Sequence, residues 1–323
     1  MADWEFRRAS VLVFDPIGPN LLATRSMLSQ IGFTAIDSTR DFQSAVRLMH
    51  DNSYELLVLE ASDAGADVCD LVKRLRAGLF GFDPFVPVIL TSWERSSSGV
   101  KTLINAGSDD LLLRPFSPAA LQERVVTLVQ RRKPFVVTSD YIGPDRRSEA
   151  NRPANAKCIT APNALKAAAS GDAQAIQRHR TAVSATRAEV DRERLRKLAM
   201  RISTAAQLQL TAGNAPGGAN EAMESVELVG VARELHGRLG RLGRAEPLEL
   251  SSTLCVIVER MAESGRAESH ELELMRDLPL GVYAALEGDG AAANARGEID
   301  MVLSKVRARF VASAEDAPSA AAG

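Results

Sequence analysis

The stretch YELLVLEAS, residues 54 to 62, reads as a buried strand that ends on an acid. Leu56 to Leu59 is a continuous apolar run, which is typical of a strand covered on both faces. Glu60 follows the run directly and precedes small residues that predict a turn. Because ligand chemistry in parallel sheets collects where the strands end, we expect Glu60 to lie at a functional edge of a sheet.

Strand-like and helix-like segments alternate on both sides of this run. The other predicted strands are Ser10–Phe14, Thr34–Ile36, Val86–Leu90 and Leu111–Leu113. Helices are predicted at Asn20–Gln30, Phe42–His50, Val68–Arg76, Gly99–Ala106 and Pro118–Gln130. Five strands separated by helices predict an α/β fold with a five-stranded, parallel, doubly wound sheet over residues 8–132.

The composition changes after Arg132. Residues 133–160 are rich in Pro, Gly, Asp and Arg, which predicts a connecting segment without a helix or a core strand. Residues 161–312 are rich in Ala and helical in period, and they predict an all-α bundle. Its helices are expected at 172–210, 221–242, 247–263, 270–286 and 297–311, and residues 313–323 are expected to be a disordered tail.

Composition narrows the classes of function. The net charge is -2 and no stretch is densely basic, so nothing favours nucleic-acid binding. The three cysteines are far apart, which favours neither a disulfide framework nor a zinc site. With no export signal and no apolar run of about 18 residues, we expect a cytoplasmic protein without a membrane span.

Polar groups follow four of the predicted strands. Asp15 follows the first strand, Glu60 the third, Thr91 the fourth and Arg114 the fifth. Since the carboxyl ends of parallel strands share one edge of the sheet, these side chains are expected to converge there. Two acids, a hydroxyl and a cation form a set suited to handling phosphate.

This set, over roughly residues 9–131, resembles the receiver domains of two-component response regulators. Such domains carry an acidic pair after the first strand, a phosphate-accepting Asp after the third, Thr or Ser after the fourth and Lys-Pro after the fifth. The resemblance implies that the two acids and the accepting Asp bind Mg²⁺.

Three departures from that pattern affect its chemistry. Pro16 stands where one acid of the pair is expected, and Glu60 is one methylene longer than the accepting Asp. Arg114 replaces the lysine, and its planar fork suits a fixed pair with a carboxylate. We therefore interpret Glu60 as a built-in negative charge that stands in for a phosphoryl group, and we expect no cofactor, since Mg²⁺ binding is doubtful. The alternative is a decayed site in which Glu60 and Arg114 form a structural ion pair.

The segment FVVTSDYIGPDRR, residues 135 to 147, is too specific in composition for a flexible tether. Its apolar start can pack on a neighbouring surface, its Gly-Pro pair forces a turn, and its arginines can pair with acids or phosphate. It is similar to segments that follow receiver-like domains in proteobacterial regulators. We predict a docking strap within residues 133–160 whose key residues are Tyr141, Gly143, Pro144, Asp145, Arg146 and Arg147. The alternative is a linker with solvated arginines.

The helical half offers one candidate group. His236 in LHGRLGRLG resembles the exposed histidine of histidine phosphotransfer domains, although Arg238 does not match the motif's lysine. The alternative is an ordinary surface histidine. No metal motif and no enzyme motif is present, so we predict neither a metal site nor an enzyme.

The long helix 172–210 carries an apolar stripe that must be covered, with members at Ile176, Val183, Val190, Leu198 and Ile202. Packing within the chain is the default, and a homodimer through this helix is the alternative.

These observations predict a bacterial two-component-type signalling protein that acts through phosphorylation-independent protein–protein interaction. The surface formed by the fourth helix, fifth strand and fifth helix of the sheet domain is expected to bind a partner protein or the chain's own helical half. Two competing hypotheses are phosphotransfer through His236 and a conventional regulator that responds to Mg²⁺ and phosphodonors.

Overall fold

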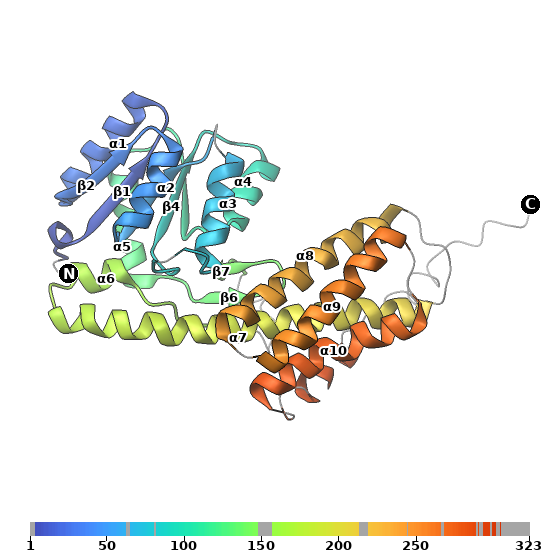
Figure 1. Cartoon of the computed structure of the whole chain (residues 1–323). Coiled ribbons are helices and arrows are strands. Elements are labelled where there is room, and N and C mark those ends of the chain that lie inside the picture. Colours follow the sequence, from blue (N-terminus) through green and yellow to red (C-terminus); the bar gives the residue numbers. More distant parts are fainter. Residues whose placement is uncertain are drawn as a thin grey trace, which may run out of the picture. The chain divides into compact units, whose positions relative to one another are not determined.

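The computed structural model describes residues 4–62, 65–80, 82–147, 157–212, 219–243, 245–265 and 268–288, and, beyond these, residues 290, 293–297, 299–301 and 304. The chain divides into two compact units, residues 1–190 and 191–323. Each unit is described by itself below, with the element labels of Figure 1.

The first unit is built on a parallel sheet with the strand order β2-β1-β3-β4-β5. The strands are β1 (Ser10–Phe14), β2 (Ala35–Thr39), β3 (Leu56–Glu60), β4 (Val88–Ser92) and β5 (Asp110–Leu113). The helices between and after them are α1 (Gly18–Ile31), α2 (Phe42–Asp51), α3 (Gly65–Arg76), α4 (Ser97–Asn105) and α5 (Pro118–Arg131). The predicted α/β class is confirmed, and the order is that of a flavodoxin-like doubly wound sheet.

Side chains of each strand alternate between two apolar layers. Val11 and Val58 face the layer that contains residues of α1 and α5. Leu12 and Leu57 face the layer that contains residues of α2, α3 and α4. Burial on both faces explains why these strands read as continuous apolar runs rather than as an alternating pattern.

Two predicted strands differ from the structure by two or three residues at an end. β4 begins at Val88, two residues after the predicted start, and includes Thr91 and Ser92. β2 continues to Thr39, because its pairing with β1 persists through polar residues. The ends of β2 and β4 are therefore set by pairing with the neighbouring strands, and apolar composition alone does not predict them.

The segment after α5 forms a small hairpin. β6 (Phe135–Val137) pairs with β7 (Ile142–Pro144) in antiparallel register, and Phe135 also bridges Ile159. The sequence analysis predicted no strand in this segment, and that prediction is wrong. Two β-prone runs pair here as a hairpin, around a short turn closed by the hydrogen bond from Thr138 to Tyr141. Residues 148–156 of the predicted strap lie outside the described residues.

Residues beyond the predicted boundary at 132 also belong to the first unit. The short helix α6 (Ala164–Ala169) adds Leu165 and Ala168 to the core beside α1 and α5. Val183 and Val190, from the first half of α7 (Ala173–Ala212), join Phe85 and Phe135 in another apolar cluster. The sheet domain, strap and start of the helical region therefore share one compact unit.

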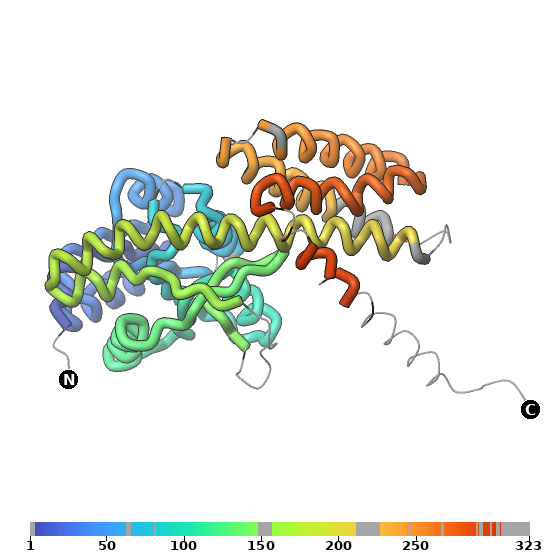
Figure 2. Tube along the Cα trace, turned by 90° about the horizontal axis from the view of Figure 1, so that it is seen from below, coloured from blue at the N-terminus to red at the C-terminus, as the bar shows by residue number. Residues whose placement is uncertain are grey.

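The second unit is helical. Besides the second half of α7 it contains α8 (Ala219–Leu242), α9 (Ala245–Ser264) and α10 (Ser269–Glu287), and α9 packs against both α8 and α10 (Figure 2). Leu198 and Ile202 of the predicted stripe are buried in its core beside Leu235 and Leu254. The predicted helical character is confirmed. Val190, Leu198 and Ile202 of the stripe are buried within the chain, and Ile176 and Val183 are half-buried. Homodimerisation through α7 stays a prediction.

The remaining helical predictions fall largely outside what the structure describes. Of the expected helix 297–311, the structure describes residues 297, 299–301 and 304. The expected tail 313–323 lies entirely outside the described residues. Among the described helices, none combines the length and the apolar composition needed to cross a membrane.

Candidate functional site

The structure brings together the four polar residues predicted at the strand ends, here named the rim cluster: Asp15, Glu60, Thr91 and Arg114. Arg114 Nε donates to Glu60 Oε2 at 2.7 Å, and its Nη2 donates to Asp15 Oδ2 at 2.8 Å. Thr91 Oγ1 donates to the same Glu60 Oε2 at 2.6 Å. No member is more than 7% exposed, so the cluster is buried.

The backbone explains this convergence. Asp15 directly follows β1, Glu60 is the last residue of β3, and Arg114 directly follows β5. Thr91 lies in β4 and pairs with Glu60 in the parallel ladder. Since β1, β3, β4 and β5 are consecutive neighbours in the sheet, their carboxyl ends meet at one edge.

Other residues complete the rim cluster, and sequence reasoning missed them. Ser62 donates to Glu60 Oε1 from its hydroxyl at 2.5 Å and from its backbone N–H at 3.2 Å. Thr24, a buried polar residue of α1, accepts a hydrogen bond from Arg114 Nη2 at 3.2 Å. The guanidinium also lies 4.8 Å from the ring centre of Phe116. The hydroxyl two residues after Glu60 was the signal that could have identified Ser62.

One cation therefore faces two carboxylates in a buried setting. Burial raises the pKa of Asp15, and the nearby Glu60 charge adds to this rise. The backbone N–H of Ile17 and the Arg114 guanidinium act in the opposite direction on this pKa. The net effect is a rise, so Asp15 holds a proton more readily than an exposed aspartate does.

The rim cluster does not fit a Mg²⁺ ion. Such an ion takes near-octahedral oxygen ligands, and the acidic pair implied by the resemblance is reduced here to Asp15. Arg114 binds one oxygen of Asp15 and one of Glu60, the two carboxylates that a cation would need. Within the described residues, no group of three or more His, Cys, Asp or Glu side chains could hold a metal ion.

The predicted strap lies against the loop before β5. An added Cβ at Gly143 would stand 2.9 Å from Gly107 Cα, and one at Gly107 would stand 2.8 Å from the carbonyl oxygen of Ile142. Arg146 Nη2 donates to the carbonyl oxygen of Ser108. Because Gly107 and Ser108 precede β5, the strap docks at the end of the sheet opposite the rim cluster.

Inside the strap, the remaining predicted residues bind one another. Tyr141 donates its hydroxyl hydrogen to the carbonyl oxygen of Pro144 at 2.9 Å. Arg147 pairs with the buried Asp145 at 2.9 Å rather than with another element. Burial also raises the pKa of the Tyr141 hydroxyl. These contacts give the strap a defined conformation.

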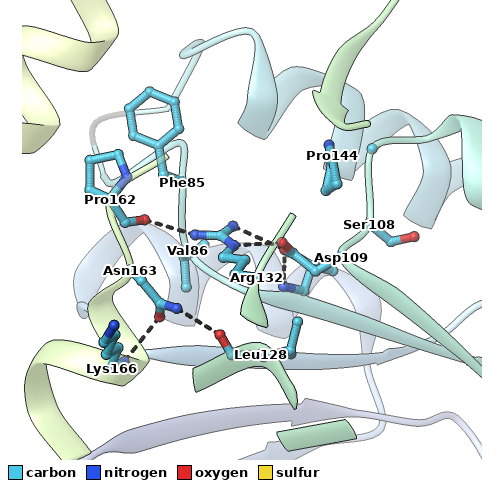
Figure 3. Close-up of polar contacts among 12 residues, drawn as sticks. Phe85, Val86, Ser108, Asp109, Leu128, Arg132, Pro144, Pro162, Asn163 and Lys166 are labelled. Carbon is cyan, nitrogen blue, oxygen red and sulfur yellow. Dashed lines mark hydrogen bonds and ion pairs between the residues drawn. The ribbon is translucent and has the colours of Figure 1, made fainter. Parts of the chain in front are cut away.

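A second ion cluster with buried side chains, missed from the sequence, lies beside the strap and is here named the Asp109 cluster: Arg76, Asp109 and Arg132. Figure 3 shows Asp109 and Arg132 of this cluster. Arg76 Nη2 donates to Asp109 Oδ2 at 2.8 Å, and Arg132 Nε donates to Asp109 Oδ1 at 2.6 Å. Both guanidinium groups lie near the ring of Phe135, at 5.2 and 5.1 Å from its centre. Burial lowers the pKa of Arg76 to about 10, which leaves it charged at neutral pH.

His236, the phosphotransfer candidate, is half-buried on α8. Its Nδ1 lies 2.8 Å from Ser251 Oγ on α9. Arg238 is buried and donates to Glu234 at 2.9 Å, so it is not a free cation beside the histidine. The phosphotransfer hypothesis predicted an exposed His236, and the structure gives a half-buried, hydrogen-bonded one.

Comparison with known proteins adds a family likeness. No family model matches the chain. Over 104 residues it is 33% identical to the transcriptional regulatory protein TctD of Salmonella typhimurium, covering 32% of this chain and 44% of TctD. Over 121 residues it is 22% identical to the chemotaxis protein CheY of Pseudomonas aeruginosa, covering 38% of this chain and 96% of CheY. The N-terminal third of the chain matches the receiver domains of response regulators.

The sequence match to TctD and CheY confirms the resemblance drawn from the strand ends. A solved response regulator from Thermotoga maritima is 24% identical, covers 37% of this chain and 95% of its own, and has a TM-score of 0.33. The orphan response regulator HP1043 of H. pylori is 21% identical, and the alignment covers 38% of this chain and 97% of HP1043, with a TM-score of 0.32. The chain spans less than half the length of TctD, and its C-terminal half is unmatched. Residues 8–132 are called the receiver unit below.

Proposed function

We propose that the receiver unit signals by binding a partner protein and does not accept a phosphoryl group. The observation that carries this proposal is the Arg114 guanidinium, which holds Asp15 and Glu60 together in the buried rim cluster. In receiver domains, the corresponding acids bind Mg²⁺ and the accepting carboxylate attacks the phosphodonor. Here the cation is supplied by the chain itself.

The hydrogen bonds of Glu60 support the same conclusion. Its Oε1 accepts from Ser62, and its Oε2 accepts from Thr91 and Arg114. An attacking carboxylate oxygen would have to leave charge-assisted bonds of 2.5 to 2.7 Å and reach a donor aligned with it. The rim cluster is therefore better suited to hold one conformation than to undergo acyl-phosphate chemistry.

The proposed partner surface is formed by α4, β5 and α5. Leu113 of β5 is 41% exposed, and Trp93, which follows β4, is 45% exposed. Both residues adjoin the rim cluster in sequence, because Leu113 precedes Arg114 and Trp93 lies two residues after Thr91. Large exposed apolar side chains are typical anchors of protein interfaces. The proposed setting is the cytoplasm of a bacterium.

Partner capture tests the proposal. Wild type, Glu60→Gln and Arg114→Ala are used as bait in a lysate of the producing cell, with and without Mg²⁺ and acetyl phosphate, and bound proteins are identified by mass spectrometry. We expect wild type to bind the same partner in both conditions and both variants to lose it. A wild-type partner that binds only in the presence of the phosphodonor would contradict the proposal.

The competing hypotheses have their own controls. Combined Pro16→Asp, Glu60→Asp and Arg114→Lys restores the receiver pattern, so this variant should respond to the phosphodonor where wild type does not. If wild type takes up phosphoryl from a partner and His236→Gln abolishes this, phosphotransfer replaces the proposed function.

A further inference from the structure

Strand β5 begins and ends at a buried ion cluster. Asp109, directly before β5, is held by Arg76 and Arg132. Arg114, directly after β5, is held by Asp15 and Glu60. One end thus places an acid between two cations, and the other places a cation between two acids. With a rise of about 3.3 Å per residue, the two ends are about 16 Å apart.

The backbone makes the segment between these clusters a single rigid piece. The N–H of Asp109 donates to the carbonyl oxygen of Val88 at 2.8 Å, and that of Arg114 donates to Ser92 at 2.8 Å. Between them β5 stays in parallel register with β4. Since a one-residue slip would turn every side chain to the other face, the register of β5 against β4 is fixed along the whole strand.

The start of β5 is also where the strap docks. Three consecutive residues contact the strap or its supports: Gly107 lies against Gly143, Ser108 accepts from Arg146, and Asp109 binds Arg132. Between Gly107 and the carbonyl oxygen of Ile142 there is too little space for one added methyl group. A displacement of this loop therefore cannot be absorbed without moving the strap.

Arg132 extends this connection to the segment after the strap. Its Nη1 donates to the carbonyl oxygen of Pro162 at 2.7 Å, next to Asn163, which caps α6 (Figure 3). Asn163 Nδ2 in turn donates to the carbonyl oxygen of Leu128 in α5 at 2.7 Å. Asp109 is thus connected through Arg132 to the residues at the start of α6, as well as to the strap.

We propose that β5 couples the rim cluster to the strap, so that a change in the pairing of Arg114 alters how firmly the strap is docked. A ligand or partner that pulls Arg114 away from Glu60 moves the end of β5. The loop at Gly107 then shifts against Gly143, and the strap loosens. This inference does not depend on the proposed function, since a phosphorylated rim cluster would be read out along the same strand.

Hydrogen exchange on the full chain, followed by mass spectrometry, tests this coupling. The amides of Phe135, Thr138 and Asp145 donate within the strap and its bridges, at 2.7, 2.9 and 2.8 Å. In Glu60→Gln, which keeps the side-chain shape, we expect strap peptides to exchange about 5-fold to 150-fold faster than in wild type, the usual range of coupling between two sites. Arg114→Ala should act in the same direction.

Two controls separate coupling from general loosening. Met49→Ala creates a cavity under α2, far from β5 in the sheet order, and should leave the ratio of strap exchange to core-strand exchange unchanged. Because coupling is reciprocal, Gly143→Ala should accelerate exchange of the Arg114 and Ala61 amides near the rim cluster.

Two results would overturn the inference. One is strap exchange in Glu60→Gln within twofold of wild type; the other is an equal acceleration in Met49→Ala. Neither result bears on the proposed function, which is tested separately by partner capture and phosphoryl uptake.

Discussion

Replacing Arg114 by alanine removes the only cation that the structure pairs with Asp15 and Glu60 among the described residues. Arg114 is 7% exposed, so the two carboxylates remain buried without compensation. Breaking a buried ion pair by removing one partner costs about 3–5 kcal/mol. Native domains are stable by only about 5–15 kcal/mol, so this loss is a large part of the total.

The cost of this substitution should depend on pH. The folded pKa of Asp15 is already raised, so its contribution to stability is greatest below the unfolded pKa and falls as pH rises through the folded pKa. Arg114 is one of the groups that lower this pKa, so its removal raises the pKa further. The variant should therefore lose more stability at about pH 8 than at about pH 5, where Asp15 is more readily protonated.

Tryptophan fluorescence during urea unfolding measures this loss. Trp4 and Trp93 are the two tryptophans of the chain and both lie in the first unit, so the signal reports that unit. Arg124→Ala is the matched control, because Arg124 forms a 3.6 Å pair with Asp110 and is 43% exposed. It should cost about 0–1 kcal/mol. If Arg114→Ala costs no more than Arg124→Ala, the rim cluster is not a buried ion cluster in solution.

The strap and the Asp109 cluster yield further predictions. Gly143→Ala places a Cβ 2.6 Å from the Tyr141 hydroxyl, and such overpacking should cost about 1–3 kcal/mol in the same unfolding assay. Gly18→Ala, whose added Cβ would meet only side-chain atoms of Arg40 at 3.7 Å or more, is its control in the same unit and should be nearly neutral; a loss as large as that of Gly143→Ala would argue against close docking. Asp109→Asn leaves Arg76 without its carboxylate and should cost about 3–5 kcal/mol, whereas an unchanged urea midpoint would show that the Asp109 cluster adds nothing to stability.

The rim cluster was predictable because its residues are encoded locally. Each buried strand is a short apolar run, and the polar residue after it marks the strand end. Parallel topology then brings Asp15, Glu60, Thr91 and Arg114 to one edge, without any need to know their pairing. What the sequence could not show is that Arg114 binds both acids at once, because this depends on side-chain geometry.

The Asp109 cluster was missed for the opposite reason. Asp109 pairs with Arg76 across 33 residues and with Arg132 across 23 residues, and charged residues at element ends usually face water. Their side chains are buried here, with Phe135 of the strap beside both guanidinium groups, and the strap was itself predicted without strands. The hairpin and α6 were missed because each is too short for a periodic pattern.

The most direct test of the account is a titration of the purified chain with Mg²⁺ and then acetyl phosphate, followed by tryptophan fluorescence and intact mass. Trp93 is suited to this because its backbone N–H donates to Ser62 Oγ, which binds Glu60. The restored variant with Pro16→Asp, Glu60→Asp and Arg114→Lys is the positive control. The account predicts a fluorescence change and a phosphoryl mass increase in the restored variant and neither in wild type. Saturable Mg²⁺ quenching with phosphoryl uptake by wild type, abolished by Glu60→Gln, would contradict it.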